Sequence, residues 1–307
     1  MKKLLSSPIF LAACAIALWS SLAVLGLALK HVPPFLLTGI ALLIGSIPAW
    51  PFFRQWRVSK GVLALGIYGL FGFHFLLFIA LRHAPAVEAN LVNYLWPLFI
   101  VVLAPLFLAG VRLSTAHVAA ALIGFAGACI AILGASSGAV AGLSVGASGG
   151  AAAGASVGVP SGALSGFAWG YIPALGSAFI WASYSLMTKR LASTGRSFPT
   201  AAIGLFGLVS GLLSLLCHAA LEPRTALSGQ DWGLMAVMGL GPLGAAFFLW
   251  DKALKLGDAR QIGILSYATP VASTVLLMLA TGRALNWSIA IATLLIVGAA
   301  VMGSRTK

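Results

Sequence analysis

Long apolar runs separated by isolated charges make up most of this chain. Four of the uncharged runs lie between Lys60 and Arg82, Glu88 and Arg112, Asp231 and Asp251, and Arg260 and Arg283. Each run is close to the roughly 20 residues that a helix needs to cross about 30 Å of hydrocarbon. The alternating segments of about ten residues that mark transmembrane strands are absent. The pattern therefore predicts an all-α integral membrane protein.

The apolar runs predict ten transmembrane helices. They are residues 9–29, 34–53, 61–82, 87–108, 115–134, 169–189, 199–219, 232–250, 260–281 and 285–304. Residues 135–168 are almost all Gly, Ala, Ser and Val, so they have few large side chains to pack and many glycines that oppose a helix. We predict an extracytoplasmic linker here. It divides one membrane domain into five-helix repeats at 1–134 and 169–307.

The two halves contain matching residues at a constant offset of 173 positions. The pairs are Gly66 with Gly239, Phe75 with Phe248, Ala86 with Ala259, Tyr94 with Tyr267, and Pro97 with Pro270. Because each half has an odd number of helices, the second copy enters the membrane from the opposite side. Inverted repeats are typical of secondary transporters, whose substrate site lies near the middle of the membrane. We therefore predict two inverted five-helix repeats around a central cavity.

Composition and charge exclude the soluble classes of protein. Hydrophobic residues make up 61% of the chain and charged residues 7%, whereas soluble domains carry about 25% charged residues. Fourteen of the 18 lysines and arginines fall on the side of the two termini, which predicts that both termini are cytoplasmic. The net charge of +13 thus reflects topology and contact with anionic headgroups, and we expect no nucleic-acid partner.

A polar stripe interrupts the fourth predicted helix. Asn90, Asn93, Tyr94 and Pro97 fall on one helical face, and Trp96 flanks it. Proline has no N–H for the carbonyl four residues earlier. That carbonyl belongs to Asn93, and in lipid it must face protein, water or a ligand. The alternatives are that the proline is only a packing kink and that the asparagine caps the gap it leaves.

The ninth predicted helix repeats this arrangement. Pro270 is expected to free the carbonyl of Ser266, beside Tyr267 on the same face. The two kinked helices would then bring carbonyl, amide, hydroxyl and aromatic groups to the middle of the membrane. Such a wall suits a small amphipathic solute, whose ammonium group meets oxygens and ring faces or whose aromatic side chain stacks on the rings.

Other candidate site residues have more than one interpretation. His74 lies inside the third predicted helix, where it either bonds a neighbouring helix or contacts a substrate carboxylate or a proton. Trp19 and Trp181, paired at a shorter offset, line the cavity or pack as core. Glu88 binds a cation or proton, or pairs with Arg82.

Alternating access is the expected mechanism. The two halves rock about the site, Pro97 and Pro270 permit bending, and Gly72 and Gly244 let the third and eighth helices slide closely past each other. The histidines lack the spacing of metal ligands, and no catalytic constellation or nucleotide-binding motif is present. We therefore expect no enzyme, cofactor, metal or ATP. The expected partners are a small solute and the lipid bilayer, and a monomer suffices.

The string "HAPAVEANLVNYLWPLFIVVLAP" resembles the drug/metabolite transporter superfamily in its EamA-like branch. The segment "NYLWP" within it is similar to the YddG-type aromatic amino acid exporters of bacterial inner membranes. This resemblance implies export of aromatic amino acids and similar solutes, other neutral amino acids among them, through a cavity walled largely by the third, fourth, eighth and ninth helices. It implies cavity roles for His74, Asn93, Tyr94 and Trp96. The long Gly/Ala/Ser insertion departs from the compact plan of that family.

An exporter of drugs or lipophilic cations such as methyl viologen is the alternative function. A cation site would need more acidic groups than Glu88 alone, so the scarcity of acids within the predicted helices favours a zwitterionic substrate.

Overall fold

A computed structural model describes residues 6–137, 168–282 and 287–305 of the chain. This part is built from helices and turns, with no strand among the described residues. Most of the predicted linker at 135–168 lies outside the described residues. The all-α prediction is confirmed for the described part.

Among the described residues, the first half contains eight α-helices, one 3-10 helix and one π-helix. They are α1 (Pro8–Ser20), α2 (Leu22–Ala28), α3 (Pro34–Ser46), η1 (Ile47–Trp56), α4 (Lys60–Ile67), η2 (Tyr68–Gly72), α5 (Phe73–His83), α6 (Ala86–Asn93), α7 (Trp96–Phe107) and α8 (Thr115–Ser137). The described part of the second half contains seven α-helices and one π-helix. They are α9 (Tyr171–Ser193), α10 (Ala202–Leu221), α11 (Gly229–Leu240), η3 (Gly241–Ala245), α12 (Ala246–Leu256), α13 (Ala259–Leu265), α14 (Ala268–Ala280) and α15 (Trp287–Arg305).

Nine segments of the described chain are long and apolar enough to cross a membrane. They are Pro8–Ala28, Pro34–Trp56, Lys60–His83, Ala86–Phe107, Thr115–Leu133, Ala202–Leu221, Gly229–Leu256, Ala259–Ala280 and Trp287–Ser304. These overlap nine of the ten predicted spans. The tenth prediction, 169–189, falls on α9, a helix of 23 residues. It is not among the nine segments, and Ser177, Ser183 and Ser185 are buried along it.

The predicted span 232–250 is too short. It was expected to end before the charged Asp251, but α12 continues to Leu256. The Nζ atom of Lys255, one turn later, lies 2.6 Å from an Asp251 carboxylate oxygen. Because the two charges neutralise each other inside the protein, they do not terminate the helix.

Local irregularities recur at the predicted offset. The π-helix η2 begins at Tyr68 and η3 begins at Gly241, 173 residues later. Both bounds of α5 are likewise 173 residues before those of α12. Single π-helical turns are rare inside α-helices and frequently occur at functional sites. The same departure from helix geometry is therefore present at equivalent positions of both halves.

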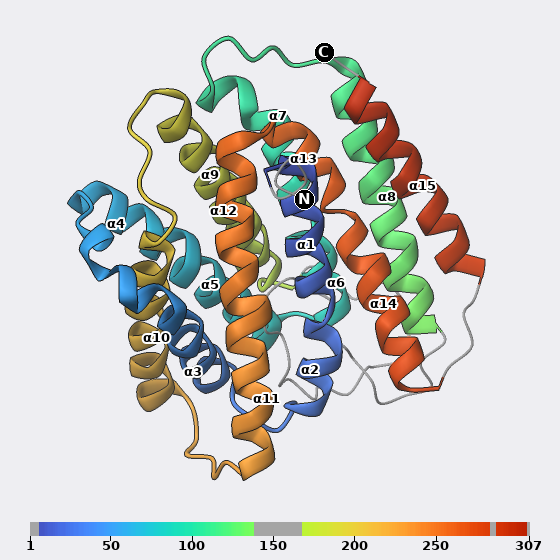
Figure 1. Ribbon diagram of the computed structural model, residues 1–307. Coiled ribbons are helices and arrows are strands. Elements are labelled where there is room, and N and C mark those ends of the chain that lie inside the picture. The colour runs from blue at the N-terminus through green and yellow to red at the C-terminus, as the bar shows by residue number, and fades with distance from the viewer. Residues whose placement is uncertain (1–5, 138–167, 283–286, 306–307) are drawn as a thin grey trace.

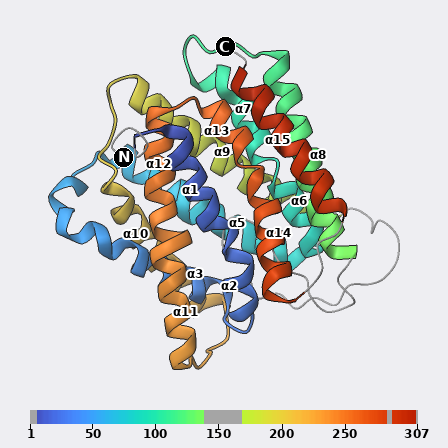
Figure 2. The same ribbon diagram turned by 45° about the vertical axis from the view of Figure 1, so that its right-hand side comes forward.

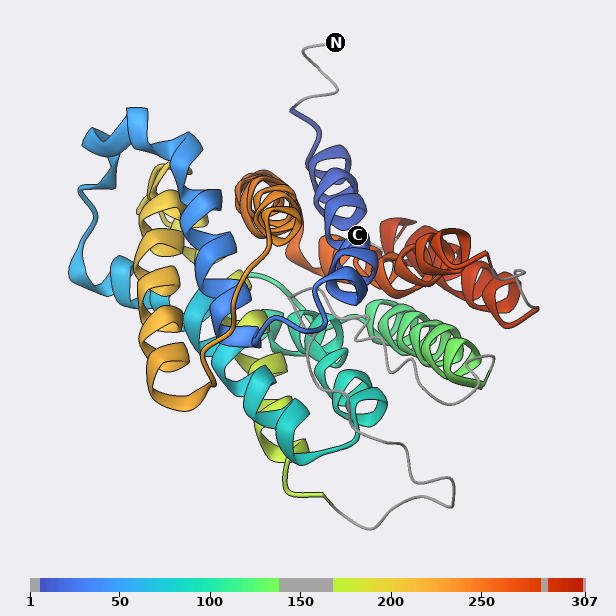
Figure 3. The same cartoon turned by 90° about the horizontal axis from the view of Figure 1, so that it is seen from below.

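Two pairs of helices form opposite edges of the molecule. α8 and α15 lie side by side at one edge, and α3 and α10 pack together at the other (Figure 1, Figure 2). Viewed from below, α1 and α12 lie between these edges (Figure 3). The helices that carry the candidate site thus occupy the middle of the assembly.

Glycines allow the edge helices to approach closely. A Cβ atom on Gly211 of α10 would lie 2.9 Å from the carbonyl oxygen of Gly39 on α3. A Cβ atom on Gly127 of α8 would lie 2.8 Å from Ile296 of α15. Between membrane helices the attraction comes largely from such close packing of small residues. Both edges are therefore tightly packed frames for the helices between them.

Candidate substrate site

Six buried aromatic side chains meet in the middle of the assembly, and we call them the aromatic cluster. They are Trp19 of α1, Phe73 of α5, Trp96 of α7, Trp181 of α9, and Phe247 and Trp250 of α12. The ring centroid of Trp250 lies 5.1 Å from Trp19 and 5.6 Å from Trp96. Trp181 stacks on Trp250 at 6.3 Å. These are separations at which aromatic rings attract each other, so five helices converge on one aromatic core.

The aromatic cluster leaves little free space. The cavity at its centre measures about 10 Å³. It is lined by Trp19, Phe73, Tyr94, Trp96, Trp181 and Thr269. A cavity of this size is about the smallest that holds one water molecule. The predicted central cavity is therefore closed in this conformation, because tryptophan rings from both halves fill its place.

Besides the Tyr267 hydroxyl, three polar atoms of predicted site residues in the first half are buried without a hydrogen-bond partner among the described residues. These atoms are Nε2 of His74, Oδ1 of Asn90 and the hydroxyl of Tyr94. A buried polar group left unpaired costs about 1–3 kcal/mol, and such groups need an explanation in a native fold. Tyr94 lines the central cavity, and His74 lies against Phe73 and Phe247 of the aromatic cluster. Tyr94 and His74 therefore border the cluster.

The tautomer of His74 follows from its other ring nitrogen. Nδ1 lies 2.6 Å from the carbonyl oxygen of Leu70, within the π-helix η2. A carbonyl only accepts hydrogen bonds, so Nδ1 carries the proton. The neutral ring then presents Nε2 as an acceptor, which suits a donor such as an ammonium group better than the carboxylate expected from the sequence.

Asn93 has a different role from Asn90. Its Oδ1 atom accepts a hydrogen bond of 2.8 Å from the Ser177 hydroxyl on α9. Ser177 also donates to the carbonyl of Ala174. The side-chain oxygen of Asn93 therefore joins α6 to α9.

The stripe predicted in the second half does not line the aromatic cluster. The ring of Tyr267 packs against Phe125 of α8, with centroids 6.3 Å apart. The Ser266 hydroxyl donates to the carbonyl of Gly263 at 2.5 Å. Thr269 lines the central cavity instead. The two repeats thus line the central cavity with different residues. Tyr267 turns away from the cavity because Gly124 of α8 leaves room for its ring.

The prolines act at helix starts instead of helix centres. Pro97 lies in the first turn of α7 and Pro270 is the third residue of α14. In a first turn the missing N–H breaks no helical hydrogen bond. The expectation that Pro270 frees the Ser266 carbonyl is wrong, because this oxygen accepts the backbone N–H of Thr269 at 3.0 Å. In each half, the helix is interrupted and a new helix begins just before the proline.

Gly72 and Gly244 do not face each other. A Cβ atom on Gly72 would lie 3.4 Å from Ile180 of α9. A Cβ atom on Gly244 would lie 3.0 Å from Gly45 of α3. Gly244 therefore allows a close approach to α3, whereas a side chain at Gly72 would make an ordinary contact with α9.

Glu88 is partly buried in the first turn of α6. Its expected pairing with Arg82 is not found, because Arg82 forms an ion pair of 2.8 Å with Glu222. No ion pair of Glu88 occurs among the described residues. The carboxylate of Glu88 is thus separate from this ion pair.

Sequence reasoning missed Phe73, Phe247, Trp250 and Thr269. The repeat offset contained a signal for Thr269, which lies 173 positions after Trp96. The predicted span 232–250 ends at Trp250 because the charged Asp251 follows it. The indole N–H of Trp250 donates to the Ser185 hydroxyl at 3.2 Å, so Trp250 is fixed in the core.

Comparison with known proteins agrees with this architecture. The sequence model of the EamA-like transporter family matches residues 6–133 and 168–305. A relative from Ancylobacter novellus, Aromatic amino acid exporter YddG, is 39% identical over 306 residues, covering 97% of each chain. A solved crystal structure is similar with a TM-score of 0.79 at 37% sequence identity, again covering 97% of each chain. The chain therefore belongs to the EamA-like transporter family and is a multi-pass membrane protein.

Proposed function

We propose that this chain exports aromatic amino acids across a bacterial inner membrane, and that the aromatic cluster is its substrate site. The observation that carries the proposal is the combination of buried tryptophans with unpaired polar atoms of Tyr94 and His74 at their border. An aromatic amino acid supplies a ring that stacks on the tryptophans and charged groups that pair with the polar atoms. The name of the relative from Ancylobacter novellus supports the same substrate class.

The polar atoms suggest how the zwitterion lies. Asn90 Oδ1 and the neutral His74 Nε2 are acceptors that pair with the ammonium group. The Tyr94 hydroxyl can donate to the carboxylate. The substrate ring then enters between Trp96 and Trp181, whose centroids are 6.4 Å apart in the closed state. Cation–π contact with the ring faces adds to ammonium binding.

The proposed architecture is ten spans in two inverted repeats, at 1–134 and 169–307, joined by the linker at 135–168. In it α9 is the tenth span and both termini are cytoplasmic. The recurrence of η2 and α5 as η3 and α12 at the offset of 173 supports the repeat. The family match in two segments of similar length supports it as well.

Alternating access requires the rings to separate on one side at a time. The breaks between α6 and α7 and between α13 and α14 are natural bending points, since each helix pair is interrupted at equivalent positions. The π-turns η2 and η3 lie directly before α5 and α12, which carry three rings of the aromatic cluster. A change in these turns would move those rings. No ATP or cofactor is needed.

Uptake into proteoliposomes tests the proposal. Labelled phenylalanine, tryptophan, threonine and methyl viologen are compared for the wild type, Trp96→Ala and the control Trp287→Ala, whose side chain is 85% exposed. We expect uptake of the aromatic amino acids, its loss in Trp96→Ala, and no change in Trp287→Ala. Circular dichroism verifies that both variants are folded. Aromatic uptake that survives Trp96→Ala rejects the site, and uptake of methyl viologen alone rejects the substrate.

The same assay addresses coupling. An imposed pH gradient, applied to the wild type and to Glu88→Gln, reports whether export is linked to protons through Glu88. Stimulation that is lost in Glu88→Gln supports this role, whereas stimulation retained in the variant excludes it.

A further inference from the structure

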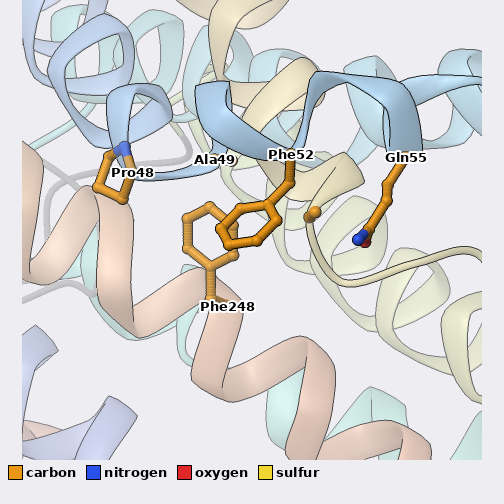
Figure 4. Close-up of a pocket in the computed structure, with 6 residues that line it drawn as sticks. Pro48, Ala49, Phe52, Gln55 and Phe248 are labelled. Carbon is orange, nitrogen blue, oxygen red and sulfur yellow. The ribbon is translucent and has the colours of Figure 1, made fainter.

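A second and larger cavity lies between η1, the start of α10, and α12. Its volume is about 320 Å³, within the range of small-molecule sites. Its lining is formed by Pro48, Ala49, Phe52, Gln55, Ala201 and Phe248. Figure 4 shows the rings of Phe52 and Phe248 reaching into the space between η1 and α12 from opposite sides (Figure 4). Gln55 brings the only hydrogen-bonding side chain of this set.

The larger cavity is adjacent to the aromatic cluster through α12. Phe247 belongs to the cluster, with its ring 5.7 Å from that of Trp181. Phe248, the next residue, lines the larger cavity. Successive side chains on a helix point about 100° apart, so the two spaces lie against different faces of the same turn of α12. A solute in the larger cavity is therefore separated from the aromatic cluster by this helix.

A buried ion pair ties two walls of this cavity together. Asp251, one turn after Phe248, accepts hydrogen bonds from Lys255 at 2.6 Å and from Thr200 at 2.7 Å. Lys255 also donates to the carbonyl of Phe198 at 2.8 Å. Thr200 directly precedes Ala201 of the lining. α12 and the start of α10 are thus joined at this point, and η1, which packs against α10, forms the third wall.

The cavity lies on the side from which an exporter takes its substrate. η1 carries Arg54, and Arg57 and Lys60 follow it directly. Lys252 and Lys255 lie at the same end of α12. Under the proposed topology this basic end is cytoplasmic.

We propose that this cavity is a loading site, which holds the ring of an aromatic amino acid from the cytoplasm before the aromatic cluster opens. Phe52 and Phe248 contact the ring, and the amide of Gln55 pairs with the ammonium or carboxylate group. This inference rests on the proposed function. An aromatic solute fits better than an acyl chain because two phenylalanine rings face the space and an amide lies at its border.

Cysteine protection tests the occupant. Phe52→Cys is made in a variant whose native cysteines Cys14, Cys129 and Cys217 are replaced, and Phe53→Cys is the matched control. Phe52 is 53% and Phe53 62% exposed, so both sites can react, but only Phe52 lines the cavity. A membrane-impermeant maleimide is applied from the cytoplasmic side. We expect phenylalanine to slow labelling at position 52 at least fivefold, threonine to have no effect, and position 53 to be unaffected.

Two further measurements separate this proposal from the proposed function. Combined with Trp96→Ala, Phe52→Cys should lose transport yet remain protected by phenylalanine, because the loading site lies outside the aromatic cluster. In transport, Phe52→Ala should raise the cytoplasmic KM for phenylalanine at least fivefold, and Phe53→Ala should not.

Protein that transports aromatic amino acids without protection at position 52 overturns the loading site alone. Labelling at position 52 that is slow with and without phenylalanine, and becomes fast after delipidation, assigns the cavity to lipid and also overturns it. Protein that transports no aromatic amino acid overturns the proposed function.

Discussion

The two ends of α10 each lie beside a buried carboxylate, and the two carboxylates are bound very differently. Glu222 follows the last residue of α10, while Asp251 contacts Thr200 just before its first residue. Both carboxylate side chains are 1% exposed. A helix of 20 residues spans about 30 Å, so the carboxylates mark opposite ends of the assembly.

Both carboxylate oxygens of Glu222 have two polar partners each. Its Oε1 atom accepts from the backbone N–H of Phe35 at 3.0 Å and from Arg82 at 2.8 Å. Its Oε2 atom accepts from the N–H of Leu36 at 3.2 Å and contacts His218 Nδ1 at 3.0 Å. The N-terminus of α3 also favours a negative charge through the helix dipole. Glu222 therefore fixes α3, α5 and α10 together.

Asp251 uses only one of its oxygens. Oδ2 accepts from Lys255 and Thr200, whereas Oδ1 is buried without a partner among the described residues. A carboxylate with both oxygens paired makes a fixed joint between the helices it contacts. A carboxylate with one free oxygen can still accept a hydrogen bond in a second arrangement of those helices, so we call it an adaptable joint. The adaptable end of α10 is the end beside the proposed loading site.

The largest expected effect comes from breaking the fixed joint. Glu222→Gln leaves Arg82 without its counter-ion and weakens the bonds to α3. Removing one partner of a buried pair costs about 3–5 kcal/mol, and we expect about 3 because Arg82 is 33% exposed. Thermal or denaturant unfolding in detergent measures this loss.

Glu88→Gln is the control for that variant, because Glu88 is only partly buried. It should change stability by less than about 0.5 kcal/mol. Equal effects of the two variants would contradict a special role for the joint at Glu222.

A smaller effect is expected at the adaptable joint. Asp251→Asn leaves Lys255 without its counter-ion, but Lys255 keeps its bond to the Phe198 carbonyl. We expect a loss of about 2 kcal/mol, measured in the same unfolding assay. Replacing both charges, in Asp251→Asn with Lys255→Met, should restore most of the stability. A double variant as unstable as the sum of its parts would show that the charges do not act as a pair.

The sequence predicts the helices far better than it predicts the site. Uncharged runs and the 173-residue offset locate nine of the spans and the recurring elements, because these patterns are local. The charge of Asp251 was misleading, since its burial depends on Thr200, which lies 51 positions away in the chain. Tyr267 matches Tyr94 by offset, yet its direction depends on the space above Gly124. Such choices are made by packing partners that no periodicity reveals.

The smallest expected effect lies at a third carboxylate, Asp258, which lies between α12 and α13 and is 33% exposed. Burial alone would raise the pKa of Asp258, but hydrogen bonds from the side chain and backbone of Arg260 outweigh it and hold the pKa below its usual value. A carboxyl group with a lowered pKa stabilises the fold above its unfolded pKa, near 3.9, and this contribution disappears as pH falls through the folded pKa.

Asp258→Asn retains an N-cap residue for α13, so only the charge is removed. Because solvent reaches Asp258, which is 33% exposed, screening should limit the loss to about 0.5 kcal/mol at neutral pH. That difference should shrink as pH falls below the unfolded pKa, near 3.9, and disappear once pH is below the lowered folded pKa of Asp258. Unfolding of both proteins from pH 7 down into acid measures it. A loss as large as that of Asp251→Asn would contradict this explanation, and so would a loss that persists in acid. Either result would mean that burial of the carboxylate does not explain why Glu222 and Asp251 stabilise the fold more than Asp258 does.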